Sequence, residues 1–148
     1  DDGGGGGGGG RGGADGGAPI NIQTLARGFS SNITTFQVSV VKDAASWQAL
    51  WAQHGGAGAA PAVDFTVDMV VGFWTGTRTS GGYGAMVTGV TGADAPPGQT
   101  GAVVSLEEVR PGANCVVTGA LTDPFHIVKT PRADVVTWQV SVRTAGCP

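Results

Sequence analysis

The stretch VDFTVDMVVGFWTGTRTSGGYGAMVTGVT, residues 63–91, joins two apolar, strand-like runs through a glycine-rich turn. Between Phe65 and Phe73 every second residue is apolar, and a period of two is typical of a strand with one face sealed in a core. The turn that follows contains Gly76, Gly81, Gly82 and Gly84. We therefore predict that residues 63–91 form a β-hairpin around which the rest of the domain packs.

Other segments have the composition or the alternation of strands. They lie at residues 33–42, 102–109, 125–130 and 136–142, and the last alternates most cleanly. We also expect three shorter features: an edge strand at residues 20–25, a turn at residues 27–32, and the start of an extended segment at residues 115–120.

One helix is predicted over residues 44–54. Asp43 has the side chain of an N-cap, and Gly55-Gly56 ends the pattern. Three large apolar side chains fall on one face, Trp47, Leu50 and Trp51. His54, at the C-terminal end, is expected to interact favourably with the helix dipole.

Together these segments predict an α+β fold that is mainly β. Most connections are too short for crossovers, so the sheet should be largely antiparallel. We expect about seven strands, arranged as a sandwich or half-barrel, with one packed amphipathic helix.

The N-terminal segment, DDGGGGGGGGRGGADGGA, cannot contribute to a core. Glycine has no side chain to bury and loses the most backbone entropy on ordering. We expect residues 1–18 to be a disordered tether and residues 19–148 to form a single β-rich domain. The tether fits a spacer behind a lipid-modified residue before Asp1, and the alternative is low-complexity debris.

Composition and charge argue against several partners. The 148 residues are 41% hydrophobic with a net charge of −3, which gives no reason to expect nucleic acid or an anionic membrane surface. No apolar run approaches the length of a membrane span. We therefore expect the protein to contact a membrane only through the lipid anchor. We also expect it to be exported to the cell envelope or outer surface.

The chain has two cysteines, Cys115 and Cys147. In an exported protein a disulfide between them would staple the chain end to the sheet and stabilise the fold by about 3–4 kcal/mol. The alternative is two unrelated thiols. We favour the disulfide, since the tether also indicates export.

The residues that could carry chemistry do not form a known constellation. The glycines of residues 76–84 separate two strands and precede no helix, unlike a phosphate-binding loop. Ser80 and His126 lack the strand–turn–helix context of a nucleophile. Adjacent carboxylates at Glu107 and Glu108 should point to opposite faces of a strand. We therefore expect neither an enzyme nor a cofactor, and no metal site.

What remains is a surface built from loops. It contains residue types that are enriched at interaction hot spots: Arg78, Tyr83, Lys129 and Arg132. Any one such residue is more often simply a solvated side chain on a turn.

The order of several short motifs resembles the PrcB C-terminal domain family, which is named for an accessory subunit of a bacterial surface protease complex. The resemblance covers residues 36–142. One departure is Ser80, where the family often has an Arg-Pro-Thr-Gly-Gly-Tyr version of the loop. The motifs are Trp47…Leu50-Trp51, Pro61…Val63-Asp64-Phe65, Met69-Val70-Val71, Gly76-x-Arg78-x-x-Gly81-Gly82-Tyr83, Pro111-Gly112, Cys115, Pro124-Phe125-His126-Ile127-Val128 and Pro131.

The resemblance implies an exported, often lipid-anchored, non-catalytic domain that binds or stabilises a partner protein, with a peptidase as one candidate. A shorter likeness, Thr79-Ser80-Gly81-Gly82-Tyr83, is similar to a loop of chagasin-type cysteine-peptidase inhibitors. The alternative function is therefore an inhibitor acting through the 78–84 and 122–132 loops. The predicted partner-binding residues are Arg78, Thr79, Ser80, Gly81, Gly82, Tyr83, His126, Lys129 and Arg132.

Overall fold

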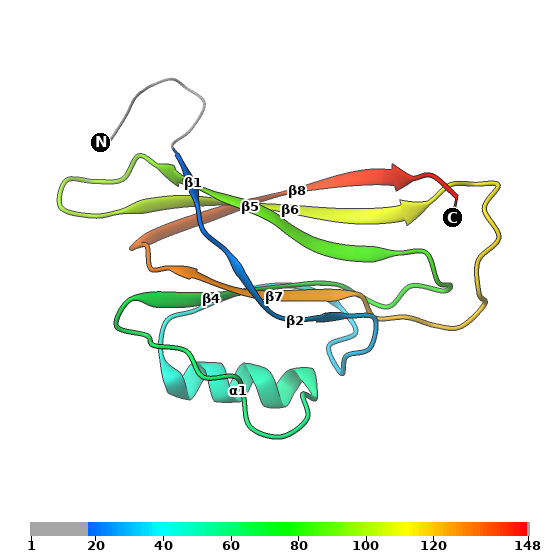
Figure 1. The fold of residues 1–148 in the computed structure, drawn as a ribbon, viewed down its shortest axis with the longest axis horizontal. Coiled ribbons are helices and arrows are strands. Elements are labelled where there is room, and N and C mark those ends of the chain that lie inside the picture. Colours follow the sequence, from blue (N-terminus) through cyan, green and yellow to red (C-terminus); the bar gives the residue numbers. More distant parts are fainter. Residues whose placement is uncertain (1–17, 148) are drawn as a thin grey trace.

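Two four-stranded sheets pack face to face, and one helix covers the outer face of the second sheet (Figure 1). The computed structural model describes residues 18–147, so the predicted tether, apart from Ala18, lies outside the described residues. The predicted α+β, mainly β fold is confirmed as a sandwich that is not closed into a barrel. Its elements are β1 (Pro19–Ile20), β2 (Gln23–Gly28), β3 (Phe36–Val41), α1 (Ala44–His54), β4 (Asp68–Thr75), β5 (Gly84–Ala93), β6 (Gly101–Pro111), β7 (Phe125–Pro131) and β8 (Val135–Ala145).

The chain passes between the two sheets four times. Sheet A has the order β1-β5-β6-β8, and sheet B has the order β2-β7-β4-β3. The strands pair antiparallel as predicted, except that β6 and β8 are parallel. This exception arises because the chain makes β7 in sheet B before it returns to sheet A.

The predicted hairpin at residues 63–91 is wrong. β4 pairs with β3 and β7, whereas β5 pairs with β1 and β6 in the other sheet. The glycine-rich segment between them is therefore a connection from one sheet to the other. Both edges of β4 are already occupied by strands from elsewhere in the chain, which leaves no place for β5 beside it.

β4 is also shorter and more buried than predicted. It begins at Asp68, because the Asp64 carboxylate accepts hydrogen bonds from the Thr66 amide and hydroxyl and folds residues 64–67 into a turn. Both of its faces are covered. Met69, Val71 and Phe73 belong to the core between the sheets, and Val70 and Trp74 belong to the core under the helix.

The helix has the predicted bounds and caps. The Asp43 carboxylate accepts from the Ser46 amide at 2.8 Å, and Gly55 adopts a left-handed conformation with φ of 82°. Trp47 and Leu50 are buried against sheet B, as their spacing predicts. Within residues 18–147 no helix has the length and apolar content that crossing a membrane requires.

The N-terminal segment closes one long side of the sandwich. The predicted edge strand at residues 20–25 is instead two strands, because the chain crosses from sheet A to sheet B at Asn21 and Ile22 (Figure 1). Ile20 and Ile22 pack against the core between the sheets. The Thr130 hydroxyl donates to the Asn21 carbonyl at 2.8 Å. β2 then continues to Gly28, into the segment predicted as a turn.

Candidate functional site

Two loops and a disulfide meet at one end of the sandwich, on the right of Figure 1. We call this the loop end; it comprises residues 76–83, residues 112–122 and the disulfide. The two loops run side by side, with Arg78 and Thr122 forming an isolated antiparallel bridge. The Gly81 amide donates to the Thr118 carbonyl at 3.0 Å. Residues 115–120, predicted as the start of a strand, form no regular element.

The predicted disulfide between Cys115 and Cys147 is confirmed, with 5.1 Å between the Cα atoms. It ties the segment after β8 to the loop after β6. Because β6 and β8 are neighbours in sheet A, the bond locks residues 112–122 onto the end of that sheet.

Arg78 is held by a buried carboxylate. Its Nε donates to Glu108 Oε2 at 2.7 Å, and Arg110 Nε approaches the same oxygen at 3.4 Å. Burial acts to raise the pKa of Glu108, but hydrogen bonds from the two arginines outweigh it and hold that pKa below its ordinary value. The Arg78 guanidinium also lies 5.8 Å from the centre of the Tyr83 ring. Arg78 thus anchors its loop to sheet A.

Gly82 allows the two loops to approach closely. It has a φ of 89°, and a Cβ at this position would lie 2.9 Å from Pro111 Cβ and 3.0 Å from Val117 Cγ1. A larger residue would therefore be strained in its backbone and would push the loops apart.

The loop end encloses a shallow, mainly apolar hollow of about 360 Å³. Apolar side chains here face solvent: Val116, which lines the hollow, is 93% exposed, and Leu121 is 69% exposed. The hollow is lined by Gly81, Gly82, Pro111, Cys115, Val116, Val117, Thr118, Ala145 and Gly146.

His126 lies inside the sandwich, with only 4% of its surface exposed. Its Nδ1 accepts from the Val87 amide at 2.9 Å, so the proton is on Nε2, which lies 2.8 Å from the Thr24 hydroxyl. Burial, with a smaller contribution from Arg27, lowers the pKa of His126 to about 4. The ring therefore joins β7 to β2 and β5 as a neutral group.

Lys129 and Arg132 lie away from the loop end: Lys129 is within β7, paired with Val70, and Arg132 follows β7 at the opposite end of the molecule. β7 runs beside β4 from one end to the other, with Phe125 paired with Trp74 and Pro131 paired with Asp68. At about 3.3 Å per residue, the distance from Phe125 to Pro131 along β7 is roughly 20 Å. Arg132 is bound to the Lys42 and Phe65 carbonyls, at 3.0 and 2.6 Å.

Of the predicted residues, only those at positions 78–83 therefore come together. The segment 122–132 was named as a loop in the inhibitor alternative, but it is largely the interior strand β7, which confirms the strand predicted at residues 125–130. The exposed apolar residues of the loop end were not predicted, since a short run such as Cys115-Val116-Val117 does not distinguish a strand from a loop. The opposite orientations of Glu107 and Glu108 were predicted: Glu107 faces outward and pairs with Arg143 at 3.1 Å.

His54 has a different role from the one predicted. It is buried, its ring centre lies 4.3 Å from that of Phe125, and its Nδ1 lies 2.7 Å from the Ser31 hydroxyl. Burial lowers its pKa, which favours the neutral ring. His54 therefore packs the helix end onto sheet B and carries little charge to interact with the dipole.

The family model described as PrcB C-terminal matches residues 69–131. Over these residues the chain is similar to that family. The match spans β4 to β7 and includes both loops of the loop end, and it confirms the resemblance over those residues. It indicates an accessory domain of a protease-related complex. No curated protein and no solved structure matches the chain.

Proposed function

We propose that this PrcB-type domain is a non-catalytic accessory domain that binds a partner protein, with a protease as the leading candidate, through the loop end. The family match supports the accessory role. The observation that carries the choice of surface is the exposure of Val116 and Leu121 on loops that are tied to each other and to sheet A.

The exposure of these side chains supports a binding surface because both loops are fixed in place by several contacts. The loops are joined to each other by the Arg78–Thr122 bridge, and to sheet A by the Arg78–Glu108 ion pair and the disulfide. A surface that is already ordered loses little conformational entropy on binding. The apolar side chains around the hollow can therefore contribute burial energy to an interface.

The proposed setting is the cell envelope or outer surface. The disulfide supports an oxidising compartment. We propose that residues 1–18 are a tether, with a lipid anchor before Asp1, and that residues 19–148 are the single domain it carries. Intact mass of the native protein would test the anchor.

The partner-binding surface can be tested by purification from native envelopes with three baits. These are the wild type, the loop-end variant Val116→Asp/Leu121→Asp, and the control Val67→Asp. Val67 is 57% exposed at the opposite end, so its substitution adds a charge away from the loop end. We expect wild type and control to retain a protease, identified by mass spectrometry, and the loop-end variant to lose it. Equal retention by all three baits would exclude the loop end.

A further inference from the structure

Among the three longest strands, β5, β6 and β8, only β8 has no buried residue. In its neighbour β6, the inward-facing Val104 and Leu106 are at most 1% exposed. Within residues 18–147, β6 is the only strand that pairs with β8, through a parallel ladder, and parallel pairing is slightly less stable per residue than antiparallel pairing. β8 is therefore held mainly by a single ladder, and solvent reaches both of its faces.

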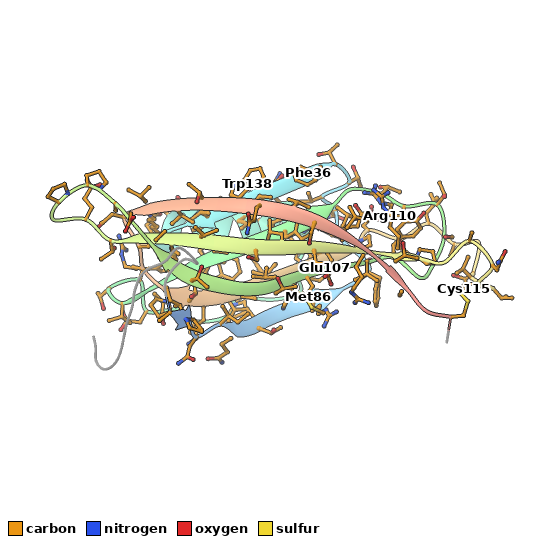
Figure 2. All side chains as sticks on the ribbon, turned by 90° about the horizontal axis from the view of Figure 1, so that it is seen from above. Phe36, Met86, Glu107, Arg110, Cys115 and Trp138 are labelled. Atoms are coloured by element: carbon orange, nitrogen blue, oxygen red, sulfur yellow. A yellow bond between two sulfur atoms is a disulfide. The ribbon has the colours of Figure 1, made fainter. Side chains whose placement is uncertain are left out.

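The core between the sheets depends little on β8. None of the buried residues of that core comes from β8, and the one β8 residue that packs against it is Val136. Farther along the strand, the Trp138 ring lies 6.3 Å from the Phe36 ring at the edge of the molecule, and both residues are about half exposed (Figure 2). An element with few buried apolar contacts opens at a free energy below that of global unfolding. Opening of β8 would therefore leave the core between the sheets largely intact.

The N-terminal end of β8 is fixed to the start of β6. The Thr100 carbonyl accepts hydrogen bonds from the Asp134 and Val135 amides, at 3.0 and 2.9 Å. The Asp134 carboxylate in turn accepts a hydrogen bond from the Thr100 amide at 2.8 Å. Ala133, just before these residues, is buried in the core. Residues 133–135 therefore form an anchored pivot at this end of the strand.

The C-terminal end of β8 is held by the disulfide. Besides the backbone ladder, this half of the strand has the Arg143–Glu107 ion pair, at 3.1 Å, and a hydrogen bond of 3.4 Å from the Ser141 hydroxyl to a β6 carbonyl. Arg143 is half exposed, and ion pairs near solvent contribute little to stability. The covalent bond between Cys115 and Cys147 is therefore the strongest attachment of this end.

We propose that β8 is a strap with a pivot at residues 133–135 and a redox latch at the Cys115–Cys147 disulfide. With the disulfide formed, β8 and residues 112–122 are held against the end of sheet A. With both cysteines reduced, β8 opens about the pivot and residues 112–122 lose their covalent attachment, while the rest of the sandwich stays folded.

The exposure of the two cysteines suits exchange with external thiols. Cys147 is exposed and Cys115 is half-buried, so Cys147 is the accessible partner. When the latch closes, the Cys147 thiolate attacks a small disulfide such as oxidised glutathione, which forms a mixed disulfide and releases one thiol. The Cys115 thiolate then attacks the Cys147 sulfur, and the second thiol leaves. The protein loses two electrons, and the two released thiols take up the two protons and the two electrons; a dithiol reverses both steps.

The latch also bears on the hollow at the loop end. Cys115 lines this hollow from one side, and Ala145 and Gly146, at the end of β8, line it from another. With the latch open the hollow is incomplete, and it is assembled once the chain reaches an oxidising compartment. This consequence for partner binding rests on the proposed function, whereas the latch itself does not.

Hydrogen exchange under native conditions tests the latch. The measured quantity is the ratio of amide protection in β8 to that in β4, because a change in global stability affects both strands alike. Oxidised wild type is compared with wild type in dithiothreitol, and we expect the ratio to fall about tenfold or more on reduction. An unchanged ratio would show that the disulfide stabilises the fold only as a whole and would overturn the proposal. Complete loss of protection in both strands would overturn it too.

The rate of reduction shows whether the latch opens in the folded protein. With excess dithiothreitol and thiol titration as the readout, we expect the rate to stay constant at urea concentrations below the unfolding transition. A rate that rises with urea in step with the unfolded population would mean that the disulfide is reached only after unfolding, which contradicts a latch.

Arg143→Ala is the matched control, because it removes the ion pair between β8 and β6 and leaves the disulfide in place. In the oxidised variant we expect the protection ratio to change less than about threefold. A fall as large as that on reduction would show that loss of any contact frees β8, and the disulfide would then have no special role. Cys115→Ser/Cys147→Ser should have the low ratio with and without dithiothreitol.

Purification from native envelopes connects the latch to the partner. We expect the oxidised wild-type bait to retain a protease and the Cys115→Ser/Cys147→Ser bait to retain about tenfold less. If no bait retains a protease although the protection ratio falls on reduction, the proposed function fails and the latch stands. Equal retention by both baits together with a fall in the ratio would refute control of partner binding by the latch.

Discussion

Arg78 Nε lies 2.7 Å from Glu108 Oε2, and this ion pair joins the connection that leaves sheet B to an interior strand of sheet A. Glu108 is buried on the inward face of β6, and Arg110 is its second partner, at 3.4 Å. The loop at residues 76–83, part of which resembles an inhibitor loop, is therefore anchored by the side chain of Arg78.

Arg78→Ala should destabilise the protein by about 2 kcal/mol, because it removes the closer partner of a buried carboxylate. Urea unfolding measures the change. Arg110→Ala is the control, since this arginine is half exposed and more distant, and it should cost less than about 1 kcal/mol. Equal effects of the two substitutions would contradict an anchoring role for Arg78.

The same pair should make stability depend on pH. The pKa of Glu108 lies below its ordinary value of 4.5 in the folded protein, so its contribution is present above that pH and is lost as pH falls through the lower, folded pKa. The difference between wild type and Arg78→Ala should therefore shrink in acid. A difference that stays constant would indicate that Arg78 acts through packing alone.

Because of His126, the free energy of unfolding should decrease in mild acid. Its pKa is about 4 in the folded protein against 6.5 ordinarily, so the unfolded chain binds the proton more readily between these values. The free energy of unfolding should thus fall as pH drops from 6.5 towards 4, by up to about 3 kcal/mol. Protonation would place an N–H at Nδ1, facing the Val87 amide.

Urea unfolding at several pH values checks this dependence. His126→Gln should reduce the slope without abolishing it, because burial lowers the pKa of His54 as well. An unfolding free energy that is flat between about pH 7 and pH 5 would contradict a buried neutral His126.

Reduction of the Cys115–Cys147 disulfide should destabilise the protein by about 3 kcal/mol, because the unfolded chain regains the freedom of the closed loop. Limited proteolysis should then cut residues 112–122 faster. Cys115→Ser/Cys147→Ser should behave like the reduced protein whether or not reductant is present. The prediction fails if oxidised and reduced wild type unfold at the same urea concentration.

Elements with local signals were predictable from the sequence. Asp43 and Gly55 marked the helix ends because capping depends on residues within one turn. The pairing of β4 and β5 was mispredicted because two adjacent strand-like runs favour a hairpin. The apolar residues on the second parity of β4, Val70 and Trp74, were the available sign that both of its faces are buried.

The candidate site was less predictable, because its partners are distant in sequence. Arg78 and Glu108 are 30 residues apart, and the sequence indicated only that each would be polar and near a turn or strand end. His126 was predicted at a binding surface, and its placement between β2 and β5 depends on how the two sheets stack.

The sequence by itself determined the helix, the main strands, the disulfide and the family resemblance, since each follows from short-range patterns or from a pairing of two cysteines. The tertiary structure decided which strands share a sheet, which charges meet, and which apolar faces are covered. Alternation of side chains specifies that one face of β8 is apolar, but only the stacking of the sheets leaves Trp138 and Val140 uncovered.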